Sequence, residues 1–202
     1  MFNGILDAAF LQAACAHAAQ PTPPEPEPDG IVFQTIEEMS VYIELTGTGE
    51  VKVQYTHNGE VQTLTYNNPN EEDVDIETDA NTDIIITGSV PTFTLGPTTA
   101  NKIKEVRALN SLITSITLGN QNNLETLCLP TTLTSASINN CTGVTTIKYP
   151  ANDNGIATKI ANIIANATAA NGVVYTDSEG AYYSTIADAA TAKGWTVEQL
   201  PA

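Results

Sequence analysis

The fold is decided by residues 103–150, whose sequence is IKEVRALNSLITSITLGNQNNLETLCLPTTLTSASINNCTGVTTIKYP. Apolar triplets with the spacing L-x-x-L-x-L recur through it: Ile103-Val106-Ala108, Ile113-Ile116-Leu118, Leu124-Leu127-Leu129, Leu133-Ala136-Ile138 and Val144-Ile147-Tyr149. The middle residues fall at positions 106, 116, 127, 136 and 147, so the steps are 10, 11, 9 and 11 residues. Short apolar strands at near-equal spacing predict a parallel β solenoid, in which each coil buries its apolar row against its neighbours.

The polar residues of the repeat support this prediction. Thr, Ser and Glu stand between the apolar positions and are expected to point outward. Amide side chains fall where turns are expected, at Asn120, Asn123, Asn139 and Asn140, and can bond free backbone groups there. The alternative is a meandering antiparallel sheet, but the joints lack the paired residues typical of tight hairpins.

Two segments of the repeat, Leu124–Pro130 and Asn140–Pro150, resemble the bacterial surface-antigen type of leucine-rich repeat. The resemblance covers roughly residues 103–150. The preceding segment Thr46–Val53 looks like the small sandwich before such repeats in proteins of gut Bacteroidetes and their phages, including head-fibre-like virion proteins. Ala108 and Ala136 depart from the pattern, where larger residues are usual. The resemblance implies protein or glycan binding and supplies no catalytic residues.

After Pro150 the periodicity becomes helical. One apolar face is formed by Ile156, Ile160, Ile163, Ile164 and Ala167, and a second by Tyr182, Tyr183, Ile186, Ala189 and Ala190. Strands are expected at 173–175 and 195–197, and Gly194 is a typical helix stop. This αβαβ unit is predicted to cap the open end of the solenoid. The single tryptophan, Trp195, is interpreted as core packing, with a ligand platform as the alternative.

Residues 31–98 are rich in strands and predict a small antiparallel, immunoglobulin-like β sandwich. Strands are expected at 31–33, 41–45, 51–55, 61–66, 74–77 and 84–86. A turn is expected at Thr46–Gly49, and Asn58-Gly59 has the residues that a two-residue hairpin requires.

A cluster of acids within this region could be taken for a calcium site: Glu71, Glu72, Asp73, Asp75, Glu77 and Asp79. Carboxylates are the ligands that calcium prefers. However, Asp73, Asp75, Glu77 and Asp79 alternate with period two, which is typical of the outer face of a half-buried strand. No EF-hand spacing is present, and no metal site is predicted.

The chain has 202 residues, of which 42% are hydrophobic, with 7 basic and 23 acidic side chains and a net charge of −16. Phosphate contacts require Lys and Arg, so nucleic acid is excluded as a partner, and binding to anionic lipid is disfavoured. The three cysteines, Cys15, Cys128 and Cys141, show no zinc spacing. A Cys128–Cys141 disulfide is not expected, because the two lie in different settings, and inert thiols are predicted.

Residues 1–20 predict an amphipathic helix whose apolar face holds Phe2, Ile5, Leu6, Ala9, Phe10 and Ala13. A secretory signal is the alternative, but no basic residue precedes the apolar run and Asp7 interrupts it. A lipoprotein signal would acylate Cys15, yet Gln12 stands where a Leu-like residue is needed. The segment is too short to span a membrane. An anchoring or oligomerising helix is therefore expected, followed at 21–30 by an extended Pro-rich linker.

The sequence presents no case for an enzyme or a cofactor. His17 and His57 have no nucleophile nearby in sequence, and no phosphate-binding loop or nucleophile elbow occurs. The expected fold is mainly β with an α/β cap: an anchor helix (1–20), a linker (21–30), a β sandwich (31–98) and a leucine-rich-repeat-like solenoid with its cap (99–202).

The expected function is that of a virion structural protein, a head fibre or capsid decoration. It would contact capsid or other virion proteins through residues 1–20 and present a surface to a host protein or glycan. A homo-oligomer, a trimer, is expected. The alternative is an exported adhesin on the bacterial cell surface.

Overall fold

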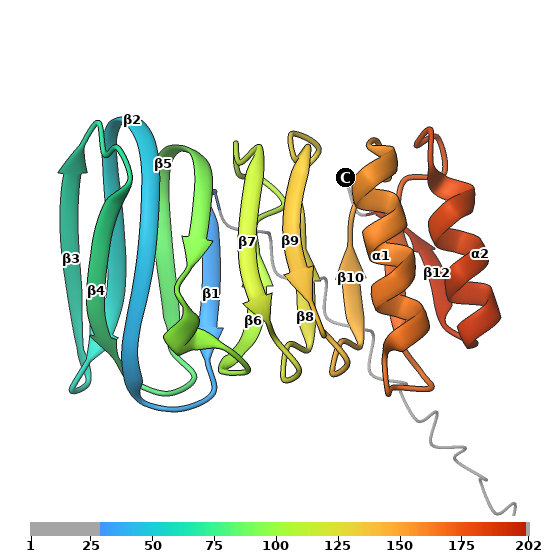
Figure 1. Ribbon diagram of the computed structural model, residues 1–202, viewed down its shortest axis with the longest axis horizontal. Helices are drawn as coiled ribbons and strands as arrows, with labels where there is room; N and C mark the ends of the chain where they lie inside the picture. Colours follow the sequence, from blue (N-terminus) through green and yellow to red (C-terminus); the bar gives the residue numbers. More distant parts are fainter. Residues whose placement is uncertain (1–28, 201–202) are drawn as a thin grey trace, which may run out of the picture.

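The computed structural model describes residues 29–200, and Figure 1 shows an elongated body with its strands stacked along the long axis and two helices at one end. The predicted helix over 1–20 lies outside these residues, as does the Pro-rich linker except for Asp29 and Gly30. In chain order the elements are β1 (Ile31–Thr35), β2 (Met39–His57), β3 (Glu60–Asn67), β4 (Glu72–Thr78), β5 (Asp83–Leu95), a 3-10 turn (Pro97–Thr99), β6 (Ile103–Arg107), β7 (Ser115–Asn120), β8 (Thr126–Cys128), β9 (Ser135–Asn139), β10 (Thr146–Lys148), α1 (Asn154–Asn166), β11 (Val173–Thr176), α2 (Tyr183–Lys193) and β12 (Thr196–Gln199).

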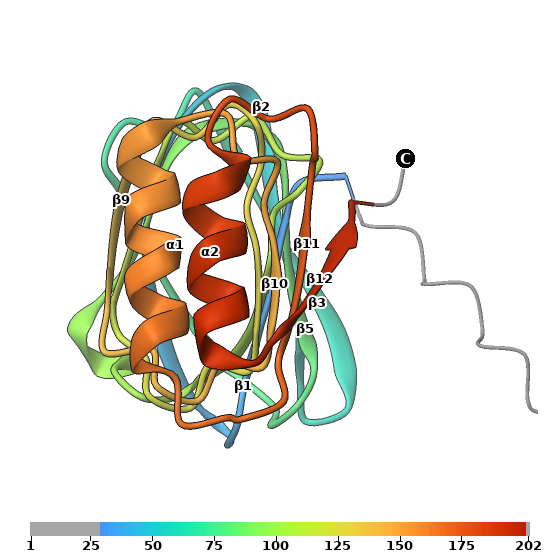
Figure 2. The same cartoon turned by 90° about the vertical axis from the view of Figure 1, so that its right-hand side faces the viewer.

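The described strands form one mixed sheet of twelve strands, which confirms the mainly β prediction. The sheet folds over into two facing layers, as the view along the long axis shows (Figure 2). The first layer has the order β12-β11-β10-β8-β6-β1-β5-β2-β3. In the second layer β4 pairs with β2, and β5 pairs with β7, which pairs with β9. Both β2 and β5 are long and bent, so each contributes to both layers.

The expected turn at Thr46–Gly49 does not reverse the chain; β2 continues through it. Both halves of β2 pair antiparallel with β5, and the register shifts between Thr46 and Thr48 and again between Thr48 and Lys52. The glycines there permit a bend instead of a hairpin: Gly49 has a φ of 73°, and a Cβ on Gly47 would lie 2.8 Å from the carbonyl oxygen of Ser89. The sequence signal was correct for an irregular backbone and wrong for a reversal.

The hairpin predicted at Asn58-Gly59 is confirmed. β2 and β3 pair from His57↔Glu60 onward, and both turn residues have positive φ, 54° and 75°. These are the conformations that a two-residue hairpin turn requires.

The apolar triplets fall on strands that alternate between the two layers. In the first layer Val106, Leu127 and Ile147 lie in register on parallel β6, β8 and β10, and in the second layer Ile116 and Ala136 lie in register on parallel β7 and β9. The spacing of about 10 residues in the sequence is therefore the step from one layer to the other. Residues that lie side by side are two triplets apart.

All fifteen triplet residues are buried, and the most exposed of them, Ile138, is 7% exposed. They belong to one hydrophobic core that extends from Ile31 in β1 to Trp195 before β12. The core and the sheet run across the predicted domain boundary at 98/99, because β1 lies between β5 and β6 and because β5 pairs with β7. The residues expected to form a separate sandwich and those of the repeat thus share their packing.

The C-terminal elements occur in the predicted αβαβ order. Asp153 caps α1 by accepting a hydrogen bond from the backbone N–H of Ile156 at 2.9 Å. Gly194 ends α2 in the left-handed conformation with a φ of 80°, as predicted. Trp195 is 4% exposed, and its indole N–H donates to the carbonyl of Ala169 at 3.0 Å, so it packs in the core. In Figure 2 the two helices lie side by side at this end of the body.

Replacement of Leu127 tests how far the fold depends on the stacked rows. Leu127 is fully buried on the middle strand of three parallel strands. Leu127→Ala is expected to lower the free energy of unfolding by about 2–5 kcal/mol, because the site cannot collapse around the lost atoms. Urea denaturation measures the change. Thr126→Ala, on the outward side of the same strand, is the matched control and should change stability by less than about 0.5 kcal/mol; equal losses for the two variants would contradict the assigned faces.

Candidate functional site

Four of the six acidic residues considered for calcium lie on β4, whereas Glu71 precedes the strand and Asp79 follows it. Asp73, Asp75 and Glu77 are exposed and alternate with buried Val74, Ile76 and Thr78, which confirms the strand-face interpretation. Among residues 29–200, no group of three His, Cys, Asp or Glu side chains is placed to hold a metal ion.

Asp79 departs from that alternation because it follows the end of β4. Its carboxylate accepts hydrogen bonds from the backbone N–H groups of Asn58 and Gly59 at 2.9 and 2.8 Å. It thereby holds the β2–β3 hairpin turn, which is a structural role that the sequence pattern did not indicate.

Among the described residues, His57 lies beside a hairpin turn, and Cys128 and Cys141 are buried. Nε2 of His57 lies 2.8 Å from the side-chain amide of Asn58 beside the hairpin turn. Cys128 and Cys141 are buried thiols that do not form a disulfide with each other. Burial raises the pKa of the Cys141 thiol from 9.0 to about 11, with a smaller lowering effect from the backbone of Gln121. Cys141 is therefore protonated at neutral pH and is a poor nucleophile. Cys15 and His17 lie outside the described residues.

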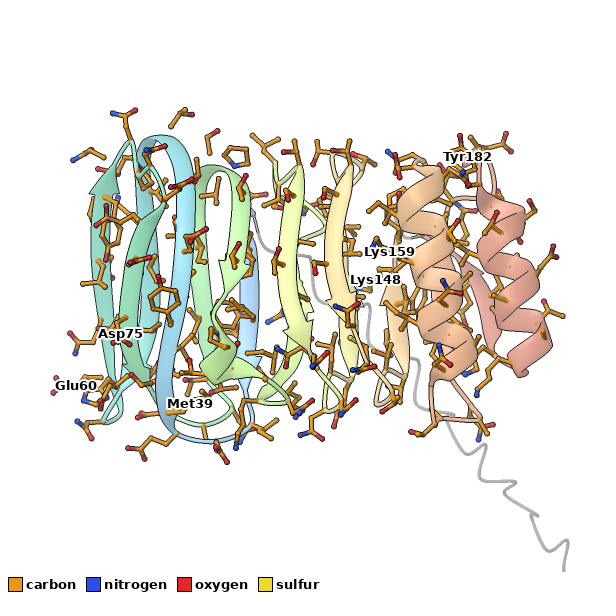
Figure 3. The ribbon with its side chains drawn as sticks, viewed as in Figure 1. Met39, Glu60, Asp75, Lys148, Lys159 and Tyr182 are labelled. Carbon is orange, nitrogen blue, oxygen red and sulfur yellow. The ribbon has the colours of Figure 1, made fainter. Side chains whose placement is uncertain are left out.

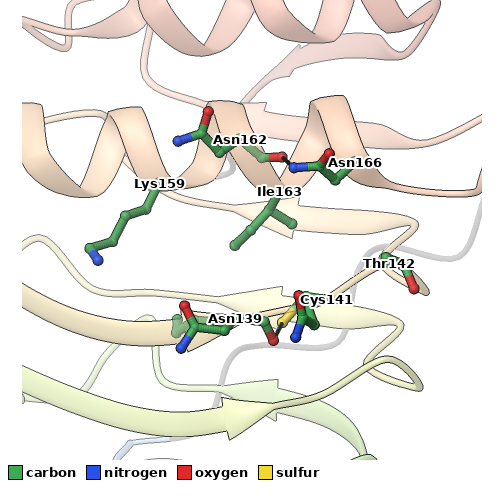
Figure 4. A pocket seen from close by; sticks show the side chains of 9 residues that line it. Asn139, Cys141, Thr142, Lys159, Asn162, Ile163 and Asn166 are labelled. Carbon is green, nitrogen blue, oxygen red and sulfur yellow. Dashed lines mark hydrogen bonds between the residues drawn. The ribbon is translucent and has the colours of Figure 1, made fainter.

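A groove lies where the second layer changes from strand to helix, between β9 with its following turn and α1. Its volume is about 510 Å³. The lining residues are Ile138, Asn139, Asn140, Cys141, Thr142, Lys159, Asn162, Ile163 and Asn166 (Figure 4). Ile138, Cys141 and Ile163 are buried and form an apolar floor, whereas the polar residues around them are mostly exposed.

The fold positions the two walls of the groove from different parts of the chain. On the strand side, the Asn140 amide donates to Oδ1 of Asn120 at 3.0 Å, and the Thr142 hydroxyl donates to Oδ1 of Asn122 at 3.4 Å. These bonds tie the turn after β9 to the turn after β7. On the helix side, the Asn166 amide donates to the carbonyl of Asn162 at 2.9 Å. The hydrogen bonds that hold each wall are made within that wall and do not cross the groove.

Three polar side chains of the groove carry unused hydrogen-bonding capacity. Within residues 29–200, the Asn139 amide and the Lys159 ammonium group have no hydrogen bond or ion pair to another side chain or to the backbone, and the same holds for the side-chain amide of Asn162. In Figure 4 Lys159 extends from α1 toward the strand side, where Asn139 lies, and Figure 3 places Lys159 on the helical half of the body, away from Asp75 and Glu60. An amide both donates and accepts, and an ammonium group donates three hydrogen bonds. The groove can therefore bind hydroxyl and carbonyl groups above an apolar floor.

The sequence predicted the strand and the helix that line this groove, but it did not predict that they form a groove. Ile138 closes the fourth triplet and Ile163 belongs to the predicted apolar helix face, yet nothing in the pattern placed these two residues opposite each other. The available signal was the change from strand period to helix period after Pro150. A helix is wider than a strand, so a helix that follows the last strand of a layer can leave a space beside that strand.

Comparison of the chain with known protein families, with curated proteins and with solved structures found no match. Among the helices that the structure describes, none combines the length and apolar character needed to cross a membrane.

The raised pKa of Cys141 gives a pH-dependent expectation. In a Cys15→Ser, Cys128→Ala background, the alkylation rate of native Cys141 should keep rising up to pH about 11, because only the thiolate reacts. The same chain in urea should level off near the ordinary thiol pKa of 9.0. Since the folded state holds this proton more tightly, the group's contribution to stability is present below pH 9 and is lost as the pH rises toward 11. A native rate that levels off near pH 9 would show that burial does not control the thiol.

Proposed function

We propose that this chain is a non-enzymatic structural and binding protein of a phage virion, a head fibre or capsid decoration. Residues 1–20 tether it to capsid or other virion proteins, and the body projects a surface toward a host protein or glycan. Under this proposal the parallel strands form a leucine-rich-repeat-like solenoid, and the αβαβ unit from α1 to β12 caps its open end. The assembled protein is a homotrimer.

The elongated repeat body is the observation that carries the proposal. Its strands stack along one axis, with β6, β8, β10, β11 and β12 in parallel register, while the second layer ends at the groove beside α1. Such stacks offer extended surfaces that are suited to binding. The chain's resemblance to repeat proteins of Bacteroidetes phages supports the placement on a virion.

The groove between β9 and α1 is the proposed recognition site, and its chemistry favours a neutral, hydroxyl-rich ligand such as a glycan. A side-chain amide can donate a hydrogen bond to one sugar hydroxyl and accept one from another. The apolar floor of Ile138 and Ile163 suits the carbon face of a sugar ring. With a single cation in its lining, the groove is poorly suited to polyanions.

Mass spectrometry of purified particles tests the virion assignment. The chain should be present as an integral component, with an intact mass that includes residues 1–18. Absence from the particles would refute the assignment. A mature chain beginning near Ala19, or one acylated on Cys15, would instead support the alternative, an exported cell-surface adhesin.

Glycan-array binding of the purified full chain tests the recognition site. Lys159→Ala and Asn139→Ala should each weaken binding about three- to tenfold, the effect of losing one hydrogen bond of about 0.5–1.5 kcal/mol. Thr158→Ala is the matched control, since it is exposed on α1 but outside the groove lining. If the control loses as much binding as the two groove variants, the glycan binds elsewhere on the chain.

A further inference from the structure

The outward side of the first layer carries a continuous row of side chains. Strand pairing places its six members next to one another in the order Ile85, Val32, Arg107, Cys128, Lys148 and Tyr175. We call this the outer row. Its members alternate along their strands with core residues, so the row belongs to the face that points away from the core.

The outer row is less exposed than an open sheet face should be. Val32 is 1% exposed and Cys128 is 0% exposed, although neither belongs to the continuous apolar cluster between the two layers. The neighbouring outward residues Thr126 and Thr146 are half-buried. On the outward side of the second layer, Ser135 and Ser137 of β9 are exposed, and Ser115 and Thr117 of β7 are half-buried. The outer row thus includes two fully buried side chains on the face of the first layer that points away from the core.

The row also carries positive charge in a strongly acidic chain. Arg107 and Lys148 are two of only seven basic residues against 23 acids. Arg107 is held by Asp83 at 3.0 Å, and the Lys148 ammonium group lies 5.9 Å from the centre of the Tyr175 ring. A segment with acidic side chains and rigid apolar rings would match this combination of charge and apolar surface.

The chain itself supplies such a segment directly before β1. Residues 21–29 alternate prolines with Glu25, Glu27 and Asp29. β1 begins inside the first layer, beside β6, so this segment starts at the outer row. A bend at Asp29–Gly30 redirects the chain there: Gly30 has a φ of 112°, and a Cβ on it would lie 2.3 Å from the carbonyl oxygen of Ile86. Only glycine fits that position.

The segment is long enough to cover the row. A polyproline-type chain rises about 3.1 Å per residue, so nine residues extend roughly 28 Å. From Val32 to Tyr175 the row crosses four strand spacings of about 4.8 Å each, roughly 19 Å. Because the segment is covalently attached next to the row, its effective concentration is far higher than that of a separate molecule.

We infer that the Pro-rich segment 21–29 docks across the outer row, with its carboxylates facing Lys148 and Arg107 and its proline rings over Val32 and Cys128. The inference is independent of the proposed function.

Alkylation of Cys128 in the full chain tests this docking, in a Cys15→Ser, Cys141→Ser background. The charge of the segment is reversed by Glu25→Lys with Glu27→Lys and Asp29→Lys. This triple variant should raise the alkylation rate of Cys128 about tenfold, because a shift of ~1.4 kcal/mol in the equilibrium between docked and undocked segment changes the undocked fraction tenfold. The matched control reverses three exposed acids elsewhere, Glu38→Lys with Glu60→Lys and Glu77→Lys, and should leave the rate unchanged. Equal rates in both reversed chains would overturn the inference. A parent rate that falls with rising protein concentration would overturn it as well, because a second copy would then cover the row.

Disulfide formation gives a second, direct measurement in a chain without other cysteines. Glu27→Cys should cross-link with Lys148→Cys under mild oxidation, and should not cross-link with Ser137→Cys on the opposite outer face. Cross-linking of both pairs at similar rates, or of neither pair, would contradict docking on the outer row.

Discussion

The structure depends on the burial of apolar side chains between two facing strand layers. Neither layer could be stable alone, because each has one apolar face and only the other layer covers it. Strand pairing keeps the rows in register, so that Val106, Leu127 and Ile147 form one continuous contact. Each added strand extends this row in one direction, which explains why the molecule is elongated rather than round.

The same constraint determines where function can be located. The interior is filled by the rows, and binding capacity is left to the outer faces, the turns and the places where the regular stacking changes. The groove beside α1 is one such place, because a helix replaces a strand in the second layer and leaves Asn139 and Lys159 at its rim. The outer row is another, since its residues lie on a face that the second layer cannot cover.

Short-range signals predicted much of the fold. The triplets identified the core, Asn58-Gly59 identified a hairpin and Gly194 identified a helix end, because each depends on neighbouring residues only. Long-range relations were not predicted. The pairing of β1 with β6, the passage of β2 through Thr46–Gly49 and the burial of Val32 depend on which strands become neighbours. The groove was missed for the same reason, since its two walls are separated by a strand and two turns.

The central position of β1 has a consequence for how the chain folds. Val32 pairs with Ile85 and with Arg107, far along the chain, whereas β6 and β8 pair over a much shorter separation, as in Val106↔Leu127. Closing a longer loop costs more entropy, and proteins dominated by distant contacts fold more slowly. During synthesis β1 must wait until β6 has emerged before both of its edges are paired. The two halves of the body are therefore joined by β1, the first of the described strands, which stays incompletely paired until β5 and β6 have been made.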